Sequence, residues 1–485
     1  MAPEAFSGLY ISGFGDASYG EEVHIDALYE AIASQNKRMN EAERAFIDGF
    51  AQGILRKTLG PPGRADANNL SEVRWGIIWP PEPLSLLERQ HQATLQDLIN
   101  LRHVQMGDRT PHQFVYRSGW TADDFLFEEG RRIETGSMQT AVVPYYLCIV
   151  GSPERIPWEF QQQLDAEYAV GRIWFDDPAD CHSYIKWLLT YERGEGSTTC
   201  AYEALFLGTQ HKNDRFTQLS SEMLVKPLHA HVRDAGLGVD ATLLLGDQPG
   251  EEAYKRNLLT RLRGYALDGE LHRLPALLFL ALHGYEDTRR STEQRARQGA
   301  PIFQEWPSTL AEVRSEEMLT GMEVNDTLHL MGTVGFCCAC YSAGTPTEQD
   351  WVQRTLLQRP ERIADAPFVS YLPQKLLAQG MIAVVGHVSR VWEYSFVGSI
   401  GVSEQEETLK DAVHMVLQGQ RIGHATNAIN TRWIHLTRRL EAQLDDRHKY
   451  SKEQIRDTWG ARNDCRGYVI LGDPAARLDM TRLVS

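Results

Sequence analysis

The feature that most constrains the fold is a series of short, unbroken apolar runs in the second half of the chain. Such runs occur in residues 202–210, 274–284, 330–344 and 381–388. Strands have this pattern when helices cover both faces of a parallel sheet, because neither face of the strand then meets water. A long amphipathic segment, residues 215–236, separates the first run from the next. The alternation predicts an α/β fold with a mostly parallel sheet flanked by helices.

The same reading extends to the rest of the chain. Further strands are expected at 239–247 and 467–474 and, in the first half, at 76–81, 112–119 and 142–151; further helices are expected at 251–264, 367–380 and from about 404 to 445. Residues 176–200 read as a helix followed by a linker, and the sequence GEGS marks a plausible boundary. A chain of 485 residues has room for two to four domains. We therefore predict two α/β units, residues 1–198 and 199–485.

Composition excludes several classes of function. The net charge of -16 disfavours direct nucleic-acid binding, which requires clustered basic residues. The first residues lack a basic region followed by an apolar core, and no stretch approaches the roughly 18 apolar residues of a membrane span. The seven cysteines form no disulfide framework. These features predict a reduced, cytoplasmic protein that contacts no membrane.

Two strand ends carry the candidate chemistry. His283 and Gly284 end the apolar run FLALHG, and Cys340 ends the run GFCCAC. Because ligands bind at the carboxyl ends of parallel strands, neighbouring strands would bring this histidine and this thiol together. A histidine favours the reactive thiolate of a nearby cysteine. The N–H groups of Gly284 and Cys340 would then stabilise an oxyanion.

Strand alternation selects one of the three clustered cysteines. Cys338 and Cys340 share a face and Cys337 points away. We expect Cys337 and Cys338 to be core residues, as buried cysteines commonly are. Cys340 lies where apolar residues give way to Tyr-Ser-Ala-Gly, so it is the one expected to reach solvent.

Alternatives to catalysis exist for each residue alone. A histidine at a strand end is commonly structural, and a cysteine after a buried strand is commonly core. A metal site is disfavoured because structural zinc ligands come in spaced pairs on turns, whereas adjacent cysteines in a strand splay apart. The order and context of the pair favour nucleophilic catalysis without a metal or cofactor.

These motifs resemble the caspase-like cysteine peptidases, which include caspases, gingipains, clostripain, separases and CHAT-domain proteases. That family has an apolar strand ending in His-Gly and a second ending in Ala-Cys, with the histidine about 50 residues earlier in caspases; here the separation, 340 minus 283, is 57. The caspase signature Q-A-C-x-G is not met. Residues 145–173 resemble a gingipain segment, residues 372–388 a CHAT segment, and the terminal LGDP at 471–474 recurs in the gingipain branch.

The resemblance implies two caspase-like units, the first non-catalytic and the second a peptidase. For individual residues, the resemblance implies that His283 is the base or the imidazolium partner and that Cys340 is the nucleophile. It implies that Gly284 and Cys340 form the oxyanion hole. It names no third catalytic residue. Glu286 and Asp287 follow the histidine and would orient it, unless they form a solvated turn.

Specificity in this family is often set by a charge on the loop after the first catalytic-unit strand. That loop, GTQHKNDRF, offers Asp214 to select a basic residue at the P1 position, which precedes the cleaved bond, or Arg215 to select an acidic one. The gingipain likeness favours Asp214 as the substrate-binding residue, although a plain solvated loop is almost as good a reading.

A polar insertion at 285–299 raises the question of self-processing. It carries four arginines, Arg289, Arg290, Arg295 and Arg297. With a basic P1 preference the insertion would be a self-cleavage site; otherwise it is a charged, solvated loop.

The sequence therefore predicts a cysteine endopeptidase that acts on a protein or peptide substrate and is regulated, with an activating partner protein. Resemblance to intracellular bacterial CHAT proteins implies an effector in defence or cell death. Two other classes stay open: a catalytically silent caspase-like scaffold that binds a partner, and a doubly wound small-molecule enzyme. The absence of G-x-x-x-x-G-K-[ST] counts against nucleotide use in the last.

Overall fold

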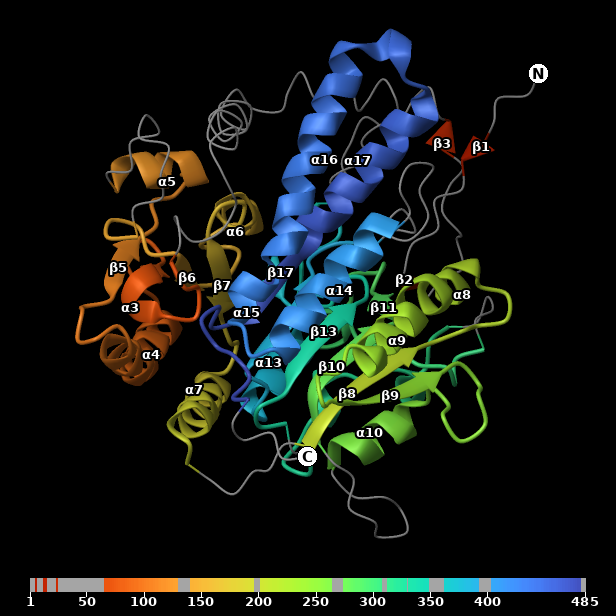
Figure 1. Cartoon of the computed structure of the whole chain (residues 1–485), viewed down its shortest axis with the longest axis horizontal. Coiled ribbons are helices and arrows are strands. Elements are labelled where there is room, and N and C mark those ends of the chain that lie inside the picture. Colours follow the sequence, from red (N-terminus) through yellow and green to blue (C-terminus); the bar gives the residue numbers. More distant parts are fainter. Residues whose placement is uncertain are drawn as a thin grey trace.

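The structure is a computed structural model that describes residues 65–129, 140–195, 201–263, 274–307, 312–328, 330–348, 362–391 and 403–480, and three short strands nearer the N-terminus. A ten-stranded sheet runs through this described part (Figure 1). Its strands, in spatial order, are β5 His112–Val115, β4 Trp75–Trp79, β6 Tyr146–Val150, β7 Ala169–Ile173, β17 Tyr468–Gly472, β16 Ala383–His387, β13 Val334–Cys338, β10 Pro275–Ala281, β8 Ala201–Gly208 and β9 Asp240–Leu245.

Most of the sheet is parallel, as the apolar runs predict. Strands β5, β4, β6 and β7 are parallel to one another, and so are β16, β13, β10, β8 and β9. Strand β17 lies between the two sets and is antiparallel to β16. Every residue of β10 and of β6 is buried, which explains why their sequences lack polar alternation. The predicted α/β fold class is confirmed.

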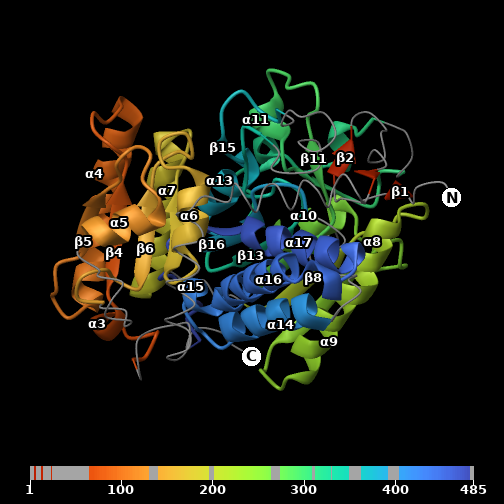
Figure 2. The ribbon, with the colours of Figure 1, turned by 90° about the horizontal axis from the view of Figure 1, so that it is seen from above.

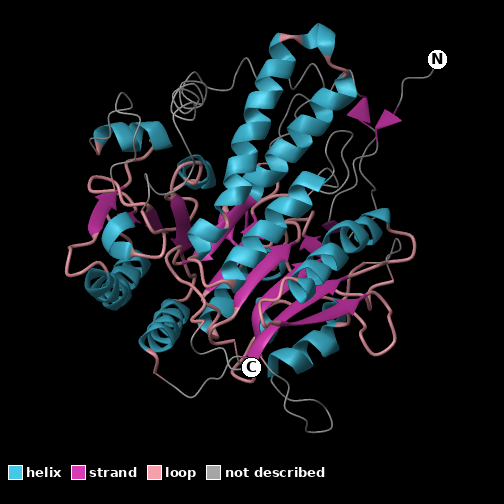
Figure 3. Cartoon of the chain, viewed as in Figure 1, coloured by secondary structure: helices cyan, strands magenta, loops and turns pink. Residues whose placement is uncertain are grey.

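Helices cover both faces of the sheet. They are α3 Leu70–Val73, α4 Leu86–Gln105, α5 Ala122–Glu128, α6 Trp158–Leu164, α7 Pro178–Arg193, α8 Arg215–Ser220, α9 Lys226–Asp234, α10 Lys255–Arg263, α11 Gln294–Arg297, α13 Tyr371–Ala378, α14 Ser403–Leu417, α15 Ile422–Ala425, α16 Asn427–Asp445 and α17 Lys452–Gly467. Helices α4, α7 and α13 pack together on one side, and α9, α14, α16 and α17 on the other (Figures 2 and 3). The result is three layers.

Local sequence signals account for the helix ends. Ser85 and Glu88 form a capping box at the start of α4, and Ser451 with Gln454 forms one at α17. Helix α7 begins after the N-cap Asp177 and ends at Gly194, whose left-handed φ of 82° suits glycine.

Some helices differ from the sequence expectations. The segment expected as one helix at 215–236 is α8 and α9 joined by a π-helical turn at Ser221–Val225. The region expected to be helical from about 404 to 445 comprises three helices, α14, α15 and α16. Helices α4 and α17 were not predicted, although both have capping boxes and α4 follows the strand expected at 76–81.

The predicted boundary between units falls in the connection between α7 and β8. Residues 196–200 of that connection lie outside the described residues. The sheet itself is continuous across the two halves, because β17, from the end of the chain, lies between β7 and β16. The division into residues 1–198 and 199–485 stays a prediction.

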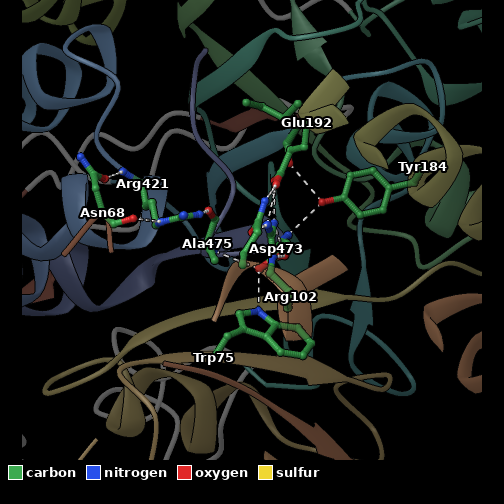
Figure 4. Close-up of polar contacts among 10 residues, drawn as sticks. Asn68, Trp75, Arg102, Tyr184, Glu192, Arg421, Asp473 and Ala475 are labelled. Atoms are coloured by element: carbon green, nitrogen blue, oxygen red, sulfur yellow. Dashed lines mark hydrogen bonds and ion pairs between the residues drawn. The ribbon is translucent and has the colours of Figure 1, made fainter. Parts of the chain in front are cut away.

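A buried polar cluster joins the first half of the chain to the end of β17 (Figure 4). Arg102 of α4 is fully buried; its Nε donates to Asp473 Oδ2 at 2.9 Å, and its Nη1 lies 2.5 Å from Glu192 Oε2. The indole N–H of Trp75 donates to Asp473 Oδ1 at 3.0 Å, and the Asp473 N–H donates to the Tyr184 hydroxyl at 2.9 Å. Nearby, the N–H of Arg421 donates to Asn68 Oδ1 at 3.1 Å. The aspartate of the terminal LGDP motif is thus a structural anion.

Two features are missing from the described part of the chain. None of its helices combines the length and the apolar character needed to cross a membrane. Within the same residues, no three histidine, cysteine or acidic side chains cluster in a way that would hold a metal ion.

Candidate active site

The two predicted strand ends lie side by side. Strand β10 pairs in parallel with β13, with Ala281 opposite Cys338. His283 follows β10 after one residue and begins β11, His283–Glu286, which belongs to a separate small sheet with β12, Pro301–Ile302, and β2, Ser12–Phe14. The prediction of neighbouring strands at this edge is therefore confirmed.

The backbones of Gly284 and Cys340 are in direct contact. A Cβ atom on Gly284 would lie 2.0 Å from the carbonyl oxygen of Cys340 and 2.8 Å from its nitrogen. No side chain fits in that space, so only glycine allows β11 to approach the turn after β13 this closely. This contact makes His283 and Cys340 neighbours, and it brings together the two residues predicted to supply the oxyanion hole.

His283 is fixed by Asp214, the residue predicted to bind substrate. Nε2 of His283 makes a short hydrogen bond with Asp214 Oδ2. Asp214 is the N-cap of α8: its Oδ1 accepts the N–H of Phe216 at 2.9 Å and that of Thr217 at 3.4 Å. Asp214 is only 7% exposed. A role of Asp214 in substrate binding stays a prediction, while its contacts inside the protein are with the histidine and the helix.

The other ring nitrogen of His283 has no hydrogen-bond partner among the described residues. This nitrogen, Nδ1, is buried. Trp306 meets the ring edge-on at a centroid distance of 5.8 Å, and Phe216 lies at 6.0 Å. A buried imidazole nitrogen without a partner is costly unless it serves a function or meets water. Among the described residues, Nδ1 is therefore the nitrogen of His283 that is open to a further partner.

Charge within this group is well defined. Burial alone would raise the pKa of Asp214, but the adjacent His283 outweighs it and lowers this pKa to about 2. His211, from the same loop, stacks on His283 at 6.2 Å and meets Trp306 at 5.4 Å. Burial, and then the neighbouring His283, lower the pKa of His211 to about 3. At neutral pH the group thus holds one carboxylate and a neutral His211 beside His283.

Cys340 is enclosed by protein. It is 0% exposed, and its Sγ accepts the N–H of Val391 at 3.2 Å. Burial raises the pKa of this thiol well above its usual value. The prediction that Cys340 reaches solvent is therefore wrong: the residue is fully buried, and the backbone of Val391 contacts its sulfur. Cys338 is buried as predicted, and Cys337, although partly exposed, packs against the core.

Glu286 and Asp287 do not orient His283. Glu286 forms a buried ion pair with Arg390, 2.9 Å from Oε2 to Nε. Asp287 accepts the Arg289 N–H at 3.1 Å and the hydroxyl of Ser291, so it stabilises the turn after β11. Both are buried, and the alternative of a solvated turn is wrong as well.

The insertion at 285–299 is folded against the body of the protein. Its end forms the short helix α11, where Arg297 pairs with Glu293 at 3.2 Å and Arg295 with Asp176 at 3.7 Å. Arg289 and Arg290 are exposed, and so is Arg215 of the first loop. Self-cleavage in the insertion stays a prediction.

Sequence reasoning missed three residues of the site. His211 lies in the loop already selected for its charges, so the histidine itself was the available signal. Val391 and Arg390 follow the strand at 381–388 by only a few residues, but no motif marks a backbone N–H or the partner of a distant glutamate.

A cavity of about 280 Å³ lies next to residues 388–390. Its wall includes Trp158, Pro346 and Arg466, which lies near the end of α17. Ser389 and Arg390 also line it, and they directly precede Val391, which contacts the thiol.

Comparisons with known proteins give the following similarities. The structure is similar to the Arg-specific cysteine proteinase gingipain R, with 14% sequence identity, 86% of this chain and 80% of that chain covered, and a TM-score of 0.48. It is similar to a structure described as a protease, with 12% identity, the same coverage and a TM-score of 0.49. A separase–securin complex from Saccharomyces cerevisiae gives 14% identity, 89% of this chain but 22% of that chain, and a TM-score of 0.32.

Gingipain and separase are both among the peptidases that the sequence motifs resemble. No protein-family model matches the chain, and no curated protein matches it in sequence. The resemblance to CHAT-domain proteases stays a prediction.

Proposed function

We propose that this protein is a cysteine endopeptidase that uses His283 and Cys340. The observation that supports the proposal is the backbone contact of Gly284 with Cys340, which brings His283, the residue before Gly284, close to Cys340 along the chain path. The imidazole is held from its far side by Asp214 and keeps Nδ1 without a partner. This is the arrangement that a nucleophile, a base and an orienting group require.

The reaction follows from these groups. His283 Nδ1 takes the proton of the Cys340 thiol, and the thiolate attacks the carbonyl carbon of a peptide bond. Backbone N–H groups of Gly284 and Cys340 stabilise the oxyanion, and protonated His283 gives its proton to the leaving amine. Water, deprotonated by His283, then releases the acid and restores the thiol. Asp214 keeps the ring oriented and stabilises the imidazolium.

A second candidate function is a silent scaffold that binds a partner protein. One observation favours it: the thiol is fully buried and its pKa is raised by that burial, so in this conformation it is protonated and unreachable. A peptidase with such a site has to open before it acts. Under the first proposal, the protein substrate or an activating partner would supply that opening.

The finer parts of the proposal rest on resemblance. These are the basic P1 preference, self-cleavage near Arg289 and Arg290, and an effector role in defence or cell death. For the P1 preference, Asp214 would have to release His283 or contact both groups, since its carboxylate is already hydrogen-bonded.

The test is cleavage of a peptide library with every residue at P1, using wild type and Cys340→Ala. We expect turnover in wild type that is lost in Cys340→Ala and in His283→Ala. Cys338→Ala, a buried cysteine two residues away, is the matched control and should keep activity. Turnover that survives in Cys340→Ala would refute the proposal.

If no library peptide is cleaved, a thiol-reactive peptide probe decides between the two candidates. The peptidase requires labelling at Cys340 that falls when His283 is replaced. Labelling that does not depend on His283 favours the scaffold.

A further inference from the structure

We propose that Arg390 is a positioning residue for the nucleophile. Its ion pair with Glu286 holds residues 389–391, here called the clamp, against Cys340. The clamp keeps the thiol in a resting position. The catalytic meaning of this inference rests on the proposed function. The claim that the clamp controls access to the Cys340 thiol rests only on the contacts described below.

The first step is the contact of the clamp with the sulfur. The Val391 N–H donates to Sγ of Cys340 at 3.2 Å, and the carbonyl oxygen of the same residue lies 3.9 Å from Sγ in position to accept the S–H. Among the described residues, these are the polar contacts of the sulfur. One residue thus offers a donor and an acceptor to the thiol, whereas His283 Nδ1 has no partner.

The second step is the attachment of the clamp to its surroundings. The carbonyl oxygen of Ser389 accepts a hydrogen bond from the N–H of Tyr341 at 2.9 Å, and this bond attaches the clamp to the turn that follows Cys340. Arg390 is 4% exposed and binds Glu286 through two nitrogens, Nε at 2.9 Å and Nη2 at 2.5 Å. Glu286 belongs to β11, the strand that also carries His283. The ion pair therefore ties the covering segment to the strand of the base.

The third step concerns how the clamp would be moved. Ser389 and Arg390 line the cavity of about 280 Å³, so a side chain that enters it touches two of the three clamp residues. Tyr341, on the thiol side, has a left-handed φ of 57°, which is unfavourable for a residue with a side chain. The clamp thus lies between a cavity and a strained turn, and moving it would uncover the thiol.

The experiment measures alkylation of Cys340 by iodoacetamide in the full chain, followed by mass spectrometry of the peptide that contains it. Removing Arg390 alone would leave Glu286 buried and unpaired, so the variant is the pair Arg390→Met with Glu286→Leu, because apolar replacement of both partners is often tolerated. We expect alkylation at pH 7.5 at least about tenfold faster than in wild type, the effect of about one pKa unit on the thiolate fraction.

The pH profile supplies a readout that a merely structural role would not move. Charged groups that act on the thiol are Glu286 on β11, Arg390 in the clamp and Asp464 on α17. We expect the midpoint of the alkylation rate to shift to lower pH in the double variant, because an exposed thiol loses its proton more readily than a buried one.

Controls separate local opening from general destabilisation. Cys148 and Cys338 are buried in the core and serve as internal reporters that should stay protected. The matched variant is Lys255→Met with Glu323→Leu, which replaces an ion pair of 2.5 Å far from the thiol in sequence.

Alkylation of Cys340 at the wild-type rate in the Arg390 double variant would overturn the clamp, and so would a parallel rise at Cys148 and Cys338. Peptide turnover is not used, so failure of the proposed function leaves this result unaffected.

Discussion

At the scale of single residues, Asp214 makes contacts that its predicted role in substrate binding does not require. Its carboxylate contacts the ring of His283 and caps α8, and it is almost fully buried. A carboxylate that orients His283 must stay hydrogen-bonded to its ring, whereas a carboxylate that selects the substrate must face the substrate. The short contact with Nε2 favours the orienting role.

Replacing Asp214 by Asn tests this choice. If the carboxylate orients His283, we expect kcat to fall by about 100-fold or more for every peptide, with little change in KM. Steady-state kinetics on peptides that differ at P1 measure this. Arg215→Ala, at the exposed neighbour, is the control and should leave kcat unchanged. A change in P1 preference without a uniform loss of kcat would instead support substrate reading.

The pKa of Asp214 gives a second observable. Since the folded-state pKa is lowered from 3.8 to about 2, the carboxylate stabilises the folded protein above the unfolded value, and this contribution disappears as the pH falls through about 2. Comparing the unfolding free energy of wild type and Asp214→Asn between pH 2 and 4 should therefore show a difference that shrinks toward the acid end.

At the scale of elements, the position of β11 decides whether a site exists. Strand β10 lies in the main sheet, but β11 leaves it and pairs with β12 instead. This change of sheet carries His283 over the turn that contains Cys340. Gly284 is the residue at which the two segments touch.

Gly284→Ala should separate β11 from the Cys340 turn. The added Cβ would meet backbone atoms, 2.0 Å from the Cys340 oxygen, and backbone cannot yield as a side-chain tip can. We expect a loss of about 1–3 kcal/mol in unfolding free energy, typical of overpacking, together with loss of turnover. Urea unfolding and the peptide assay measure the two effects.

The matched control is Gly335→Ala in the neighbouring strand β13. There the nearest atom is the sulfur of Met381 at 3.3 Å, the end of a flexible side chain. We expect a small effect on stability and none on turnover. Equal losses in the two variants would contradict the special role of the Gly284 contact.

The strands of the sheet could be predicted from the sequence to a greater extent than the contacts within the candidate site. The strands of the second half of the chain could be predicted because burial on both faces leaves a continuous apolar run, and His283 and Cys340 were selected because they end such runs. The contact between Asp214 and His283 spans 69 positions, and that between Glu286 and Arg390 spans 104. Pairings at such separations depend on loop paths, which a local pattern does not encode. Burial of Cys340 was missed for the same reason, since the cover comes from Val391.

At the scale of the whole molecule, the cluster around Arg102 explains how the two halves of the chain form one sheet. Strand β17 comes from the end of the sequence yet lies beside β7. Asp473, directly after β17, meets the indole of Trp75 from β4 and the guanidinium of Arg102 from α4. The segment after β17 is thus attached to the first half of the chain by charged groups that burial makes mutually dependent.

Arg102→Met should therefore destabilise the entire fold rather than one half. The substitution leaves the carboxylates of Asp473 and Glu192 buried without their cation, and we expect a loss of about 3–5 kcal/mol in unfolding free energy. Urea unfolding followed by far-UV circular dichroism and by tryptophan fluorescence measures it, and both signals should shift together if the halves unfold as one unit. Arg233→Ala, which removes an exposed pair with Asp234, should leave the midpoint unchanged. A loss confined to one signal would mean that the halves are stable independently, as the predicted division near residue 198 would allow.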